Sequence, residues 1–154
     1  FNILGEIVCG TRVLDLFAGS GSLGLEALSR GARHVTFVEE GDWAQKSLFE
    51  NIDALGLKER SAFLKQDVFR ALRRLEKEGE NFDLIFLDPP YNQGLVKKLL
   101  NALGRSDILT PQTQVVLHRS RQEKLPDSLE GLELLREKQI GQACLSFLSK
   151  SVKA

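Results

Sequence analysis

Short apolar runs along the chain alternate with longer segments whose apolar residues recur at helical spacing. The apolar runs predict strands at residues 12–17, 34–39, 61–65, 82–87 and 113–118. The segments between them predict helices at residues 22–30, 42–56, 68–78 and 92–103. Because strand and helix alternate, the pattern favours an α/β fold, with a parallel sheet, helices on both faces and right-handed crossovers.

The alternation ends after Pro126. Residues 132–140 and 142–148 both have strand character and are joined at Gly141. We therefore expect them to close the sheet as an antiparallel pair.

The predicted helix at 42–56 carries the single tryptophan of the chain. Trp43 recurs at helical spacing with Leu48 and Ile52, which predicts a place for it in the core and not against a ligand. Gly56 is a stop signal for the same helix.

A glycine-rich turn joins the first predicted strand to the first predicted helix. Its sequence from Gly19 to Gly24 has the spacing G-x-G-x-x-G, which permits a tight turn and lets a ligand approach the backbone. Glu39 ends the next strand, where a carboxylate can accept hydrogen bonds from ribose hydroxyls. We therefore expect a nucleotide-type cofactor to be bound by Asp15, Phe17, Ala18, Gly19, Gly21, Gly24 and Glu39.

A rigid turn, Asp88-Pro89-Pro90-Tyr91, follows the apolar run 82–87. Prolines fix φ and remove donors, so the carbonyls here are held in place. Such a turn suits a flat ring with an exocyclic amine, which would stack on Tyr91 and donate to Asp88. These four residues are the candidate catalytic residues, with Asp88 also at the cofactor. The alternative is a plain turn that ends a strand.

The glycine turn alone would fit either a dinucleotide or S-adenosylmethionine. Asp15 lies within the first strand, where its carboxylate could accept a hydrogen bond from an ammonium group or order the glycine turn. The pyrophosphate of NAD is itself negatively charged, so a further carboxylate would not help to bind it. The turn at Asp88 offers no chemistry for hydride transfer but fits an amine that accepts a methyl group. These residues favour S-adenosylmethionine over NAD.

The candidate residues all follow predicted strands. In an open parallel sheet, ligands bind outside the carboxyl ends of the strands. Asp67 is placed to accept from an adenine amine, while the amide of Val68 reaches a ring nitrogen. Asp67 is an equally good N-cap for the helix at 68–78, and both roles are compatible.

Composition is that of an ordinary globular protein, with 42% hydrophobic and 27% charged residues. The length suits one domain over residues 1–154. The two cysteines, Cys9 and Cys144, have no metal-ligand spacing and read as free thiols in a reducing cytoplasm. The two histidines are too isolated for a metal site, and no signal peptide or membrane span is visible.

The 21 basic and 21 acidic residues give zero net charge, which counts against broad nonspecific binding of nucleic acid. A local patch of basic residues that binds nucleic acid is still compatible with zero net charge. If the strand at 113–118 neighbours the strand at 82–87, His118, Arg119 and Arg121 emerge beside Asp88. We expect Arg119 and Arg121 to hold nucleic-acid phosphates there, the alternative being a solvated basic loop.

Together these motifs resemble the bacterial small-subunit ribosomal RNA guanine-N2 methyltransferases. The resemblance covers nearly the whole chain and is carried by Leu4, residues 13–31 (VLDLFAGSGSLGLEALSRG), Val38-Glu39, residues 88–91 and Gly141-Gln142. It implies a three-layer, Rossmann-like class I methyltransferase fold with a mostly parallel seven-stranded sheet and an antiparallel C-terminal strand. It also implies a cytoplasmic, monomeric enzyme that uses S-adenosylmethionine, without a metal, on a guanine of 16S ribosomal RNA or the assembling 30S subunit.

One departure from the family concerns the start of the chain. It opens at Phe1 and contains no methionine, whereas family members carry an N-terminal extension rich in arginine and proline. We expect the chain to be truncated at its N-terminus relative to the family.

The turn at residues 88–91 is shared with other enzymes that methylate exocyclic amines. The alternatives are therefore a methyltransferase acting on DNA adenine or protein glutamine, or a non-catalytic RNA-binding module that acts in assembly. The first would need a target-recognition segment, for which the chain has no room.

Overall fold

The computed structural model describes residues 8–90 and 94–151. Leu4 and Tyr91, which the sequence singled out, lie outside the described residues. The elements follow in the order β1 (Arg12–Leu16), α1 (Ser22–Ser29), β2 (His34–Val38), α2 (Asp42–Leu55), η2 (Lys58–Arg60), β3 (Ser61–Leu64), α3 (Val68–Lys77), β4 (Phe82–Leu87), α4 (Leu95–Gly104), β5 (Leu109–Ser120), β6 (Leu132–Ile140) and β7 (Ala143–Lys150).

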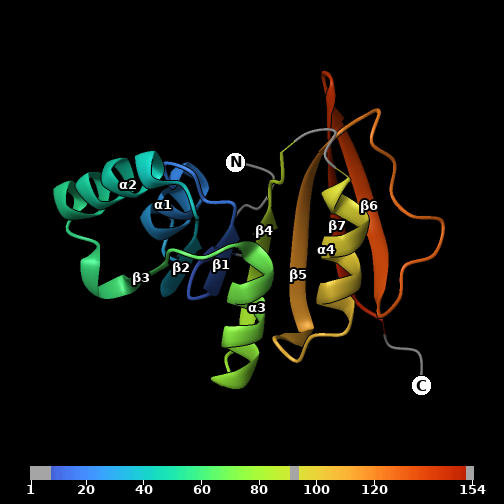
Figure 1. Cartoon of the computed structure of the whole chain (residues 1–154), viewed down its shortest axis with the longest axis horizontal. Helices are drawn as coiled ribbons and strands as arrows, with labels where there is room; N and C mark the ends of the chain where they lie inside the picture. Colours follow the sequence, from blue (N-terminus) through green and yellow to red (C-terminus); the bar gives the residue numbers. More distant parts are fainter. Residues whose placement is uncertain (1–7, 91–93, 152–154) are drawn as a thin grey trace.

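The strands form one seven-stranded sheet in the order β3-β2-β1-β4-β5-β7-β6 (Figure 1). The first five strands in that order pair in parallel, and β7 is antiparallel to both β5 and β6. This confirms the expected α/β architecture and the closing antiparallel pair. The strand order reverses between β1 and β4, which is where open sheets of this kind bind ligands.

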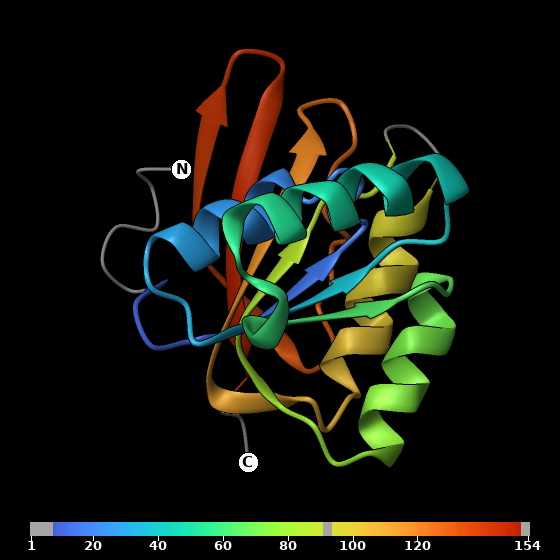
Figure 2. The same ribbon diagram turned by 90° about the vertical axis from the view of Figure 1, so that its left-hand side faces the viewer.

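Helices cover both faces of the sheet (Figure 2). On one face, α3 and α4 pack on buried side chains of the sheet, which include Leu14 and Leu16 of β1. On the other face, α1 and α2 pack on Val13, Val35 and their neighbours. Since successive strand residues point to opposite faces, consecutive apolar residues such as Val13 and Leu14 serve different cores. This explains why the parallel strands are continuous apolar runs.

The strand expected at 113–118 is longer and begins at Leu109. It contains Pro111, which the pairing with β4 accommodates through a register shift between Phe82 and Leu84. The side chain of Thr113 closes this irregularity by donating to the carbonyl of Phe82. Most other predicted ends agree to within one or two residues, and Gly56 ends α2 with a φ of 67° as expected.

The prediction for Trp43 is wrong, because its side chain is 73% exposed. The buried positions of α2 are Ala44, Leu48 and Ile52, a regular four-residue stripe. Trp43 precedes that stripe by one residue, and one residue rotates a side chain by about 100° around a helix. It therefore faces away from the sheet.

Cys9 is exposed, Cys144 is buried, and both are free thiols. Across residues 8–90 and 94–151, no helix combines the length and hydropathy that a membrane span requires.

Candidate active site

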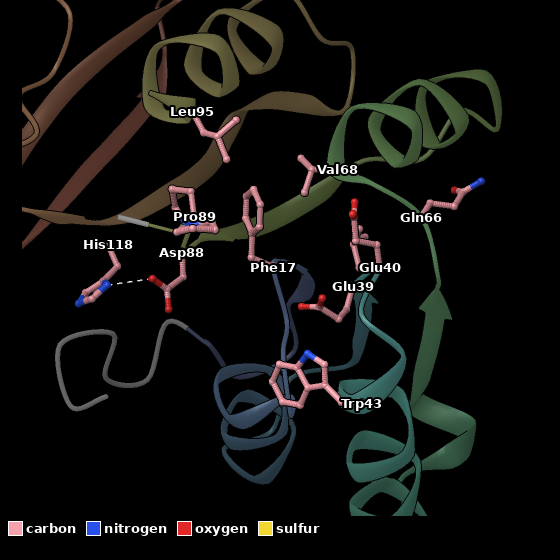
Figure 3. Close-up of a pocket in the computed structure, with 12 residues that line it drawn as sticks. Phe17, Glu39, Glu40, Trp43, Gln66, Val68, Asp88, Pro89, Leu95 and His118 are labelled. Atoms are coloured by element: carbon pink, nitrogen blue, oxygen red, sulfur yellow. Dashed lines mark hydrogen bonds and ion pairs between the residues drawn. The ribbon is translucent and has the colours of Figure 1, made fainter. Parts of the chain in front are cut away.

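A cavity of about 680 Å³ opens at the carboxyl ends of the parallel strands (Figure 3). This volume is typical of small-molecule and cofactor sites. Segments at the ends of β1 to β4 contribute to it, together with His118 near the end of β5, as the sequence predicted. The lining residues are Phe17, Val38, Glu39, Glu40, Trp43, Gln66, Val68, Asp88, Pro89, Pro90, Leu95 and His118.

The glycine turn is shaped by backbone conformation and by close packing. Gly19 and Gly21 have φ of 58° and 87°, in the left-handed region that favours glycine. A Cβ on Gly24 would lie 2.3 Å from Cε1 of Phe37, so only glycine lets α1 pack this closely on β2. Gly21 and Gly24 therefore act through the shape of the turn, and neither is among the residues that line the cavity.

Phe17 is the non-glycine residue in the described chain with positive φ, at 63°. It comes directly after β1, and Figure 3 shows its ring projecting into the cavity. A phenylalanine in the left-handed region is strained, and such strain clusters at functional sites. Nothing in the sequence motif reveals this conformation.

Glu39 ties the glycine turn to the start of α2. Its Oε1 accepts a hydrogen bond from the amide of Gly19 at 2.8 Å, and its Oε2 accepts from the amide of Gly41 at 2.9 Å. Each carboxylate oxygen has a second lone pair. The side chain lines the cavity, so acceptor capacity is left for a ligand hydroxyl.

Asp15 lies behind the cavity wall and is 1% exposed. Its Oδ2 accepts a hydrogen bond from the amide of Gly24 at 3.1 Å. Burial raises the pKa of Asp15 to about 7, and the negative charges of Asp88 and Glu39 add to the rise. The sequence left two roles open for Asp15, which were to accept from an ammonium group or to order the glycine turn. The hydrogen bond from Gly24 gives it the second role.

Asp67 caps α3. Its Oδ1 accepts from the amides of Phe69 and Arg70, at 2.9 Å and 3.4 Å. Its neighbours on both sides, Gln66 and Val68, line the cavity. Contact of Asp67 and Val68 with an adenine ring stays a prediction.

Asp88 and His118 meet at the other end of the cavity. Leu87 of β4 pairs with Leu117 of β5, so the residues that follow them emerge side by side. The Nδ1 of His118 lies 2.9 Å from Oδ1 of Asp88 (Figure 3). With the proton on Nδ1 the imidazole donates to the carboxylate and fixes its orientation, leaving Oδ2 for another donor. The sequence placed His118 here but did not predict this pairing.

The expectation that Arg119 holds phosphates is corrected by its burial. Arg119 is 8% exposed, and its guanidinium is paired with Glu137 and donates to Ser146 and to the carbonyl of Glu123. The hydroxyl of Ser146 and the guanidinium of Arg119 hold the pKa of Glu137 below its usual range. Arg119 therefore ties β5 to β6 across β7, which lies between them in the sheet. Arg121 is exposed, as expected.

No cluster of three or more potential metal ligands exists among the described residues. The polar groups that line the cavity include the carboxylates of Glu39, Glu40 and Asp88, the amide of Gln66 and the imidazole of His118.

Comparisons with known proteins identify the family of the chain. Residues 1–149 match the model of a family described as Conserved hypothetical protein 95. The chain is 35% identical over 150 residues to YlbH of Bacillus subtilis, covering 97% of this chain and 82% of YlbH. It is 32% identical over 153 residues to ribosomal RNA small subunit methyltransferase D of Escherichia coli, covering 99% of this chain and 75% of the relative.

Among solved structures, a conserved hypothetical protein from Streptococcus pyogenes superposes with a TM-score of 0.87 at 35% identity. That match covers 98% of this chain and 92% of the other. The protein SMU.776, solved as a complex with SAH, matches with a TM-score of 0.75 at 16% identity, a likeness in fold alone.

Proposed function

Because the chain belongs to the family described as Conserved hypothetical protein 95, alongside ribosomal RNA small subunit methyltransferase D, we propose that it is an S-adenosylmethionine-dependent methyltransferase of 16S ribosomal RNA. We propose further that the acceptor is the exocyclic amine, N2, of one guanine. Such a substrate would place the protein in the cytoplasm, acting on the RNA or on the assembling 30S subunit.

One observation carries the proposal. Glu39, the residue suited to ribose hydroxyls, and Asp88, the residue suited to an amine, line the same cavity. A cofactor whose ribose lies on Glu39 can therefore direct its reactive end towards Asp88. The cavity volume of about 680 Å³ is sufficient for such a ligand and part of a base.

The nucleoside half of the site would be formed by Glu39, Glu40, Gln66, Val68 and Trp43. A Cβ on Gly41 would lie 3.0 Å from Nε1 of Trp43 and 3.2 Å from Oε2 of Glu39, so the indole edge is next to the ribose carboxylate. An exposed indole on a cavity wall offers a large apolar face for a nucleoside. Trp43 therefore belongs to the site.

The acceptor half would be formed by Asp88, Pro89 and Pro90, with Tyr91 stacking on the base as the sequence predicts. The lone pair of a guanine amine is delocalised into the ring, so the amine is a poor nucleophile. Asp88 and the carbonyl of Pro89 would accept its two N–H bonds and hold the nitrogen towards the methyl group. His118 would keep Asp88 in the orientation that leaves Oδ2 for the amine.

S-adenosylmethionine, when bound, supplies an activated methyl group on a positively charged sulfur. The protein's own contribution is then mainly positioning, which can supply a large part of a rate enhancement. The methylated amine is acidic and releases its proton late, so Asp88 can take it without being a strong base.

Trp43 provides the test, because it is the single tryptophan of the chain and lines the cavity. Titration with S-adenosylmethionine, or with its demethylated product, should change the tryptophan fluorescence and saturate. Asp88→Asn should leave this titration nearly unchanged but abolish methyl transfer to RNA, since Asp88 faces the acceptor. Tighter binding of NAD than of either ligand would contradict the cofactor assignment.

A further inference from the structure

Exposed cations line up along α3, the helix that begins at the cavity. Arg70, Arg73, Arg74 and Lys77 are all exposed, at the spacing i, i+3, i+4 and i+7 that places them on one face of a helix. The opposite face of α3 is buried against the sheet through Val68, Ala71, Leu72 and Leu75. The cations therefore point to solvent as one row.

Few carboxylates neutralise this row. Among the described residues, Arg74 pairs with Glu78 at 3.5 Å, and both side chains are about half exposed. Exposed pairs of this kind are weak. The row borders a groove of about 580 Å³, which is lined by Gln66, Arg70, Arg73, Arg74, Lys77 and Glu78.

The groove adjoins the candidate active site, since Gln66 lines both. The neighbouring helix extends the positive surface. Helices α3 and α4 lie side by side on one face of the sheet (Figures 1 and 2), and Nζ of Lys98 is 4.6 Å from the ring centre of Phe69. Lys97, one residue away, is also exposed.

Charge is separated between the two helix layers. Helices α3 and α4 carry six basic residues and one acidic residue. Helices α1 and α2, on the other face, carry one basic and four acidic residues. The zero net charge of the chain thus conceals one strongly basic face.

We propose that this basic face, formed by Arg70, Arg73, Arg74, Lys77, Lys97 and Lys98, binds the phosphate backbone of the RNA whose guanine enters the site at Asp88. The inference rests on the proposed function and names a surface that the substrate uses. Arg70 and Lys77 are about 10 Å apart along the helix axis, at 1.5 Å per residue. The row is therefore long enough to contact more than one phosphate of the same strand. With Arg119 buried, this face supplies the phosphate contacts that the sequence had assigned to Arg119.

The test compares two triple charge reversals in the 154-residue chain. One variant carries Arg70→Glu, Arg73→Glu and Lys77→Glu on α3. The matched control carries Arg33→Glu, Lys46→Glu and Lys58→Glu, which are exposed residues on or near the α1–α2 layer and change the net charge equally. The probe is a fluorescein-labelled transcript of the 16S ribosomal RNA region, titrated at several KCl concentrations. Cofactor binding is followed in parallel by Trp43 fluorescence.

The α3 variant should lose at least about tenfold in RNA affinity at low salt, and its log K against log salt slope should fall by about 2–3, as expected for three lost phosphate contacts. The control should change affinity by less than about threefold, and both variants should bind the cofactor normally. Equal losses in the two variants, or no loss in the α3 variant, would overturn the inference. Absence of cofactor binding by the unmodified chain would instead reject the proposed function.

Discussion

The buried carboxyl of Asp15 should make the stability of this protein fall as the pH rises. Its pKa is about 7 in the folded chain against 3.8 for an unperturbed aspartate. Below pH 3.8 the carboxyl is protonated in both states and has no effect. Between the two values the unfolded chain releases a proton that the folded chain retains, which favours unfolding. Above pH 7 ionisation of Asp15 lowers the free energy of unfolding by its full amount, on the order of 4 kcal/mol at 1.36 kcal/mol per pKa unit.

Asp15→Asn removes this cost while keeping an oxygen that accepts from the amide of Gly24. Asparagine places N–H donors where protonated aspartic acid places an O–H donor, so the two neutral side chains should differ little in stability. The variant should therefore gain stability relative to the original chain as the pH increases. Between pH 5 and pH 8 the gain should grow by about 3 kcal/mol, taken from the two pKa units that separate pH 5 from pH 7.

Urea unfolding followed by far-ultraviolet circular dichroism at pH 5, 6, 7 and 8 measures this difference directly. If the stability difference between the two chains stayed constant with pH, Asp15 would have the same pKa in the folded and unfolded chains, and burial would not raise it. A variant that is less stable at every pH would show that the second carboxylate oxygen has a partner that asparagine cannot replace.

Three further changes test other parts of the structure. Gly24→Ala should cost about 1–3 kcal/mol in urea unfolding, because its Cβ would overlap the ring of Phe37, and unchanged stability would contradict the close packing. Glu39→Gln should weaken cofactor binding, measured by calorimetry, by about 1–3 kcal/mol, since an amide can accept from only one of the two backbone amides. Arg119→Met should destabilise the chain by about 1–3 kcal/mol through the loss of its contacts with Glu137, and should leave the salt dependence of RNA binding unchanged. A reduced salt slope in Arg119→Met would return Arg119 to the RNA surface.

The parallel sheet and the convergence of the site could be predicted because both follow from repeated strand–helix units. Parallel strands present their carboxyl ends at one edge, so Glu39 and Asp88 had to approach each other once the alternation was recognised. The N-cap role of Asp67 was likewise local, depending on residue type and position.

The features that the sequence did not predict depend on how a side chain is rotated around its helix and on the register in which strands pair. Trp43 precedes the buried stripe of α2 by one residue, which turns its side chain out of that stripe. Arg119 lies within β5 and is buried, whereas Arg121 lies beyond the end of the strand at Ser120 and is exposed. The length of β5 was hidden by Pro111, which resembles a strand breaker until a register shift admits it. The pairing of His118 with Asp88 joins residues thirty positions apart and requires the register of β4 and β5.

Nucleoside mass spectrometry of RNA after reaction tests the assignment of guanine N2 as the methyl acceptor. Small ribosomal subunits, or their 16S RNA, from cells lacking the modification would be incubated with the chain and S-adenosylmethionine carrying a deuterated methyl group. One deuterated N2-methylguanosine is expected per RNA molecule, and none when Asp88→Asn replaces the original chain. Label in another nucleoside, label in a ribosomal protein, or equal label with Asp88→Asn would contradict it.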